Sequence, residues 1–176
     1  MARERTRYIV RFIRSARPSP VLMGLLVTSV ISCAGSVFDI EKSLKVSEVT
    51  TGWFDTGIVQ GNLNRLVPTL AFQLENITDT EISSVQVLAV FRRSGEHEEW
   101  GSAFARVIGA EGLPSGVMSQ PIVLRSDLGY TGEQPRLDMF ENRLFVDVNV
   151  ELSLKYRGEQ WVKITDFLIE RQLLTE

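Results

Sequence analysis

Apolar and polar residues alternate along much of the chain after residue 38, which is typical of β-strands that bury one face. The longest example covers residues 146–156, where six apolar side chains occupy every second position. The length of this alternation predicts a strand in the middle of a sheet. The short polar turn at residues 157–160 predicts that this strand pairs antiparallel with a strand that begins at Trp161.

Shorter stretches of the same kind predict the other strands, separated by Gly, Pro, Asn and Asp signals. The expected strands cover residues 44–49, 69–75, 82–92, 100–108, 120–124 and 161–169, and the expected turns and loops cover residues 52–57, 61–64, 76–80, 94–97, 110–119 and 126–135. We expect residues 69–75 and 82–92 to form a hairpin, and Pro121 to place its strand at a sheet edge. This spacing predicts an all-β fold, an antiparallel immunoglobulin-like β-sandwich of about seven strands.

A different pattern precedes the sandwich. Residues 18–38 carry no charge, and an apolar run of about 20 residues is long enough to cross a bilayer as a helix. Six arginines and one acid, Glu4, lie before it, spaced as on a basic amphipathic helix. By the positive-inside rule, the N-terminus stays in the cytoplasm and the remainder crosses the membrane. We therefore divide the chain into a signal or membrane-anchor segment, 1–38, and a sandwich domain, 39–176.

These residues alone do not determine whether the apolar run is retained in the membrane or cleaved off. It is consistent with an uncleaved transmembrane helix and equally with a secretory signal that is removed. An arginine-rich amphipathic start is also typical of a mitochondrial presequence, so a mitochondrial membrane is the alternative location.

The chain's single cysteine adds a third interpretation. The sequence Val30-Ile31-Ser32-Cys33 resembles the lipobox of bacterial lipoproteins, although that family usually has Leu at the first position and Ala or Gly at the third. The resemblance implies cleavage before Cys33 and lipidation of its thiol. It also implies a membrane-anchored domain in the periplasm or on the cell surface.

Residues 71–92, FQLENITDTEISSVQVLAVFRR, resemble a hairpin of small immunoglobulin-like domains of the late-embryogenesis-abundant and FxLYD types. The FxLYD signature itself is absent from this chain. The resemblance implies a fold class and brings no active site with it.

Charge and composition exclude several functions. The chain has 19 basic and 22 acidic residues, and removing the six N-terminal arginines and Glu4 leaves 13 against 21, a net charge of −8. An acidic domain is poorly suited to nucleic acid, because phosphate binding needs clustered cations. One cysteine excludes an internal disulfide and a thiolate metal cluster. His97, the only histidine, lies in a charged turn, so we expect no catalytic residues, no metal and no cofactor.

These features together favour a non-enzymatic, membrane-tethered envelope protein that serves as an interaction or structural module. The alternative is an accessory subunit of a larger membrane complex, held by an uncleaved N-terminal transmembrane helix. In both cases we expect protein partners in addition to the membrane. The long irregular stretch offers a candidate interaction loop containing Asp127, Tyr130 and Glu133.

Overall fold

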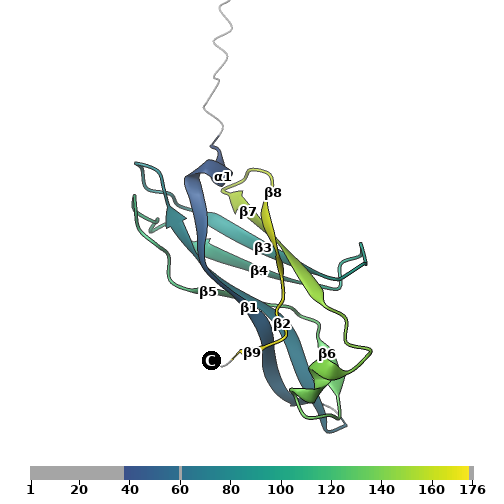
Figure 1. The fold of residues 1–176 in the computed structure, drawn as a ribbon. Helices are drawn as coiled ribbons and strands as arrows, with labels where there is room; N and C mark the ends of the chain where they lie inside the picture. The colour runs from purple at the N-terminus through teal and green to yellow at the C-terminus, as the bar shows by residue number, and fades with distance from the viewer. Residues whose placement is uncertain (1–37, 60, 175–176) are drawn as a thin grey trace, which may run out of the picture. The chain divides into compact units, whose positions relative to one another are not determined.

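The computed structural model describes residues 38–59 and 61–174, which form a β-sandwich of two sheets (Figure 1). The all-β fold class predicted from the sequence is confirmed. The first sheet has the order β5–β2–β1–β9, with β6 also paired to β2, and the second has the order β4–β3–β7–β8. The elements are α1 (Ile40–Ser43), β1 (Leu44–Val59), β2 (Leu63–Asn76), β3 (Val85–Arg93), β4 (Gly101–Ile108), β5 (Ile122–Arg125), β6 (Tyr130–Gly132), η1 (Asp138–Glu141), β7 (Val148–Tyr156), β8 (Val162–Leu168) and β9 (Leu173–Leu174).

The connections between the sheets have the Greek-key order of an immunoglobulin-like sandwich. Strands β1 and β2 pair with each other, and the chain then crosses to β3 in the facing sheet. Strand β5 returns to the first sheet beside β2, and β7 lies beside β3 in the second. Residues 38–59 and 61–174 contain nine strands, of which β6 and β9 are short. The seven longer strands agree with the predicted number of about seven.

The predicted hairpin between residues 69–75 and 82–92 is wrong. These residues belong to β2 and β3, which pair with different neighbours in different sheets. Their buried faces meet across the core, with Leu70 and Phe72 on one side and Val87 and Phe91 on the other. Alternation therefore identified the buried face correctly, but it does not specify which strand lies next in the sheet.

The turn predicted at residues 52–57 is also wrong, because β1 continues through it. Gly52 pairs with Thr69, and Trp53 pairs with Pro68, which lies well inside β2. A side chain at Gly52 would meet Leu174 at 2.8 Å, so the glycine permits the close approach of β9. The actual turn falls near the predicted loop at 61–64, where Gly61 and Asn62 both have positive φ.

The prediction for the strand at residues 146–156 is confirmed. Strand β7 lies between β3 and β8 and pairs antiparallel with both. Val150 and Leu152 are fully buried on its inner face, whereas Glu151 on the other face forms ion pairs with Arg92 and Lys163. The short strand β5 lies at a sheet edge, as Pro121 predicted.

Five aromatic rings pack together at the end of the sandwich that carries β6, which Figure 1 shows away from α1. The ring centroids of Trp53 and Phe145 lie 4.7 Å apart, and those of Tyr130 and Phe145 lie 4.6 Å apart. Strands β1 and β2 extend past the four-stranded sheet here, so the rings fill the space that a facing sheet would occupy. We call this group the aromatic cluster; its members are Trp53, Trp100, Tyr130, Phe140 and Phe145.

The helix α1 and a buried amide close the other end. Asp39 caps α1 by accepting a hydrogen bond from the Lys42 backbone, and Phe38 stacks on Tyr156 with centroids 4.0 Å apart. The fully buried Asn76 donates to the carbonyls of Thr80 and Leu113, both at 2.8 Å. Its own oxygen accepts from the Thr78 backbone, as the predicted turn at residues 76–80 requires.

The predicted signal or transmembrane helix and the lipobox lie outside the described residues. Within residues 38–59 and 61–174, no helix has the length and apolar character needed to span a bilayer.

Candidate functional site

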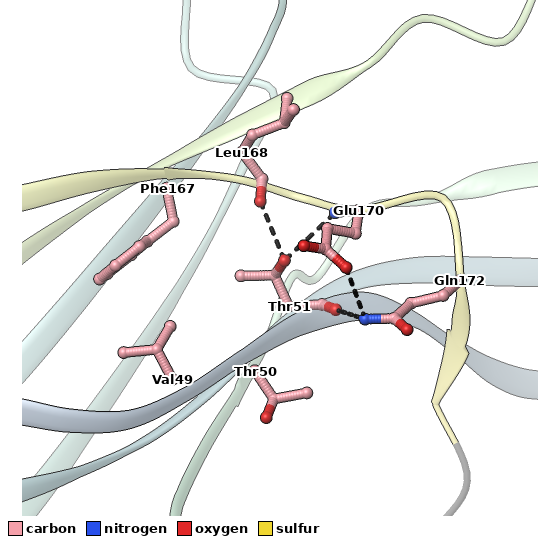
Figure 2. Close-up of a pocket in the computed structure, with 7 residues that line it drawn as sticks. All are labelled: Val49, Thr50, Thr51, Phe167, Leu168, Glu170 and Gln172. Carbon is pink, nitrogen blue, oxygen red and sulfur yellow. Dashed lines mark hydrogen bonds between the residues drawn. The ribbon is translucent and has the colours of Figure 1, made fainter.

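A groove opens where the edges of the two sheets face each other, between β1 and β8 (Figure 2). Its volume is about 440 Å³. The pairing of the strands leaves the groove open, because β8 pairs only with β7 and β9 covers the edge of β1 only at Trp53 and Phe54. The lining residues are Val49, Thr50, Thr51, Phe167, Leu168, Glu170 and Gln172.

A β-bulge in β1 shapes one wall of this groove. Glu48 and Val49 together lie opposite Phe72, and Glu48 adopts a positive φ of 51°. A bulge bends its strand and interrupts the regular edge. The groove therefore does not present a long, straight edge on which a partner strand could align.

A network of hydrogen bonds forms the polar part of the groove. The Thr51 hydroxyl donates to the Leu168 carbonyl at 2.9 Å and accepts from the Glu170 backbone at 3.2 Å. The Gln172 amide donates to the Thr51 carbonyl at 2.7 Å and to the Glu170 carboxylate at 3.0 Å. Figure 2 shows these bonds converging on Thr51, so the polar groups mainly hold the C-terminal segment against β1.

The accessible lining is mixed, with polar and apolar surface in similar measure. Val49 and the Phe167 ring supply its apolar part from the two walls, whereas the Leu168 side chain is directed away from Thr51 (Figure 2). Glu170 is the only ionisable side chain among the described lining residues, and its carboxylate is bonded to Gln172. This arrangement can hold an apolar side chain of a partner, but it supplies no acid–base pair for catalysis.

The three residues of the predicted interaction loop serve different purposes. Asp127 accepts a hydrogen bond from the Ser102 backbone at 2.9 Å and so connects the loop to β4. Tyr130 belongs to the aromatic cluster, and its hydroxyl accepts from the Val146 backbone N–H at 3.0 Å. Glu133 is exposed and has no hydrogen bond or ion pair to any described residue.

A second, smaller hollow of about 220 Å³ lies beside Tyr130 at the end of the sandwich away from α1. Its wall includes Leu144, which is 72% exposed, and Met139 of η1. The predicted loop therefore borders an apolar hollow, although Asp127 and Tyr130 are used within the domain.

Residues of the larger groove were missed by sequence reasoning. Thr51 and Gln172 are 121 positions apart, and neither belongs to a recognisable motif. The exposed Leu168 was the one signal, because it interrupts the outward polar pattern of its strand. His97 lies in an exposed loop, and no group of three or more His, Cys, Asp or Glu in the described part of the chain could hold a metal. Cys33 lies outside the described residues.

No protein-family model matches the chain, and no curated protein matches it. Among solved structures, the chain is similar to one described as "X-ray structure of Northeast Structural Genomics Consortium target SoR45". The TM-score is 0.39 and the sequence identity is 10%, over 74% of this chain and 89% of the other. At this level of similarity, nothing about function transfers from that protein.

Proposed function

We propose that this protein is a membrane-tethered envelope protein whose β-sandwich lies outside the cytoplasmic membrane and acts by binding a protein partner. The observation that carries the proposal is the short stretch of sequence between Cys33 and the packed residue Phe38. Phe38 already packs on Tyr156, and it follows Cys33 by only five residues.

This spacing suits a tethered domain. Five extended residues span at most about 18 Å, so a lipid on Cys33, or an apolar helix ending near it, would hold the sandwich close to the bilayer. The arginines before the apolar run favour a cytoplasmic N-terminus and an exported domain. An exported domain with a net negative charge is suited to protein partners rather than to nucleic acid.

The groove between β1 and β8 is the surface we assign to the partner. It combines exposed Val49 and half-buried Phe167 with a floor fixed by the hydrogen bonds of Thr51. A preorganised hollow with apolar groups on two walls binds an apolar anchor side chain at low entropic cost.

Intact-mass measurement of the full chain purified from bacterial membranes tests the anchoring. We expect a product that begins at Cys33 and carries a diacylglyceryl group, and we expect the Cys33→Ser variant to lose this modification. A full-length, unlipidated chain that resists salt and alkaline extraction would instead favour the alternative, an accessory subunit with an uncleaved helix. Recovery of the protein in the soluble fraction with a free thiol at Cys33 would contradict both.

Photo-crosslinking in cells tests the binding surface. A photoreactive residue at exposed Val49 should give a discrete crosslinked product with a partner protein, whereas one at exposed Val123, on the edge strand β5, serves as the control. Equal products from both positions, or none from Val49, would show that the groove is not the partner site.

A further inference from the structure

The outer face of the four-stranded sheet carries cations and aromatic rings side by side. Strand pairing aligns Arg106, Gln86 and Lys155 in one row across β4, β3 and β7. Residues directly opposite on neighbouring strands project to the same face. The Trp161 ring joins this row, because its centroid lies 5.7 Å from the Lys155 ammonium.

A second ring extends the same surface. Phe104 of β4 meets Trp161 edge to face, with centroids 6.2 Å apart. Phe104 is 60% exposed and Trp161 is 38% exposed, so the pair presents a large apolar area to solvent. We call this surface the proximal patch, and its members are Phe104, Arg106, Lys155, Arg157 and Trp161.

The cations of the proximal patch are not neutralised by neighbouring acids. Among the described residues, no ion pair is formed by Arg106, Lys155 or Arg157. Arg157 lies in the turn after β7 over the ring of Tyr156, and Glu159 is the one acid of that turn. A group of unpaired cations is notable because the chain after residue 17 has a net charge of −8.

The proximal patch lies at the end of the sandwich where the described chain begins. Tyr156, which follows Lys155, stacks on Phe38, and Val162, which follows Trp161, shares a hollow with Phe38 and α1. Figure 1 shows α1 beside the end of β7 and the start of β8. Phe38, the first described residue, therefore lies beside the patch.

We propose that the proximal patch rests on an anionic phospholipid surface, that of the membrane that anchors the chain. This inference rests on the proposed anchoring. Tryptophan prefers the interface between water and hydrocarbon, and lysine and arginine are attracted to anionic headgroups. The short tether keeps the patch within reach of the headgroups, and contact there turns the aromatic-cluster end of the sandwich away from the bilayer.

Tryptophan quenching by brominated lipids tests this contact in the full chain, reconstituted in vesicles. The chain has three tryptophans, and Trp53 and Trp100 both belong to the aromatic cluster at the other end. Emission lost in the Trp161→Phe variant therefore reports on the patch. We expect this component to be quenched in brominated phosphatidylcholine containing phosphatidylglycerol, and to be quenched much less in neutral vesicles or in high salt.

Charge variants provide matched controls. Arg106→Gln should weaken the contact about fivefold, the effect of removing one cation near an anionic surface. Arg143→Gln, which removes an exposed arginine near the aromatic cluster, should leave the quenching unchanged. Equal effects of the two variants, or equal quenching in neutral vesicles, would overturn the assignment to anionic lipid.

The same samples separate the two proposals. A chain that sediments with vesicles while Trp161 stays unquenched contradicts the patch and leaves the anchoring intact. A chain that remains in the supernatant contradicts the anchoring. It also contradicts the lipid contact of the proximal patch, because that contact depends on the anchoring.

Discussion

The two ends of the sandwich are closed by opposite kinds of chemistry. At the end near β6, aromatic rings fill the space between the sheets, centred on the fully buried Trp53. At the end near α1, the buried amide of Asn76 satisfies backbone groups of the crossing loops. The first end is held mainly by the packing of rings, whereas the second combines buried apolar side chains such as Ile40 and Ile82 with the hydrogen bonds of a buried amide. The interactions that close the space between the two sheets thus differ from one end of the sandwich to the other.

The geometry of the strands explains the difference. Near β6, β1 and β2 extend beyond the four-stranded sheet. No strand of that sheet covers them here, so side chains must fill the space above their inner face. Near α1, the chain crosses between sheets through residues 77–84, and the gap contains backbone carbonyls that must be paired. Aromatic rings suit the first requirement, and an amide with two donors and an acceptor suits the second.

Removing the central ring should give the largest effect. Trp53→Ala should lower the free energy of unfolding by about 3–5 kcal/mol, through lost burial and a cavity in the aromatic cluster. Trp161→Ala, at an exposed ring, should change the stability by no more than about 1 kcal/mol. Urea unfolding of the full chain, followed by circular dichroism, compares the two. Similar losses for both variants would show that the cluster does not hold its end of the sandwich.

Removing the buried amide should give the next largest effect. Asn76→Ala should destabilise the protein by about 2–3 kcal/mol, because it removes three hydrogen bonds between a buried side chain and the backbone: those to the carbonyls of Thr80 and Leu113 and the one from the Thr78 N–H. Asn149→Ala serves as the control, since that exposed amide donates only to the Ser94 hydroxyl and its loss should be nearly neutral. Urea midpoints measure both variants. A harmless Asn76→Ala would mean that the α1 end is held by apolar packing after all.

A polar contact made by the Tyr130 hydroxyl at the aromatic end sharpens the comparison. The Tyr130 hydroxyl accepts from the Val146 N–H at 3.0 Å and lies 3.3 Å from its carbonyl. Tyr130→Phe should therefore cost about 1 kcal/mol, the net value of a typical hydrogen bond. Tyr156→Phe, whose hydroxyl has no hydrogen bond to a described residue, should cost less. A loss of several kcal/mol at Tyr130 would show that hydrogen bonding also dominates this end.

The smallest effect concerns the exposed cap of α1. A hydrogen bond from the Lys42 ammonium, at 2.6 Å, holds the pKa of Asp39 below its usual value. A lowered folded-state pKa means that the contribution to stability is present above the unfolded pKa of about 3.9 and is lost as the pH falls through the folded value. A carboxyl NMR titration should show the Asp39 pKa rising in Lys42→Gln. An unchanged pKa would mean that the ion pair does not persist in solution.

The four-stranded sheet could be predicted from the sequence better than the five-stranded one. Strand β7 alternates without interruption, and its short turn to β8 determines the pairing, so both were found. Strand β1 contains two register irregularities and glycines at 52 and 57, which are local signals for a turn. Its strand geometry comes from pairing with β2 and from contact with β9, both of which are tertiary effects.

The candidate groove was beyond sequence reasoning for a related reason. Its walls come from β1 and β8, which belong to different sheets and are joined only through the hydrogen bonds of Thr51. Local patterns report on burial within one strand, and they carry no information about which edges meet. Tyr130 was selected as a loop residue, and only the packing around Phe145 shows that its ring is part of the interior.

The parallel pairing of β1 with β9 has a consequence for how the chain is made. Thr51 and Gln172 are separated by 121 residues, so at the usual rate of synthesis β1 waits roughly ten seconds for its last neighbour to be made. Until then the edge that β9 will cover at Trp53 has no partner on that side. The bulge at Glu48 interrupts the remaining open edge and so discourages pairing with another unfinished chain. Once β9 is made, it thus protects the β1 edge at Trp53 and Phe54 from pairing with another chain.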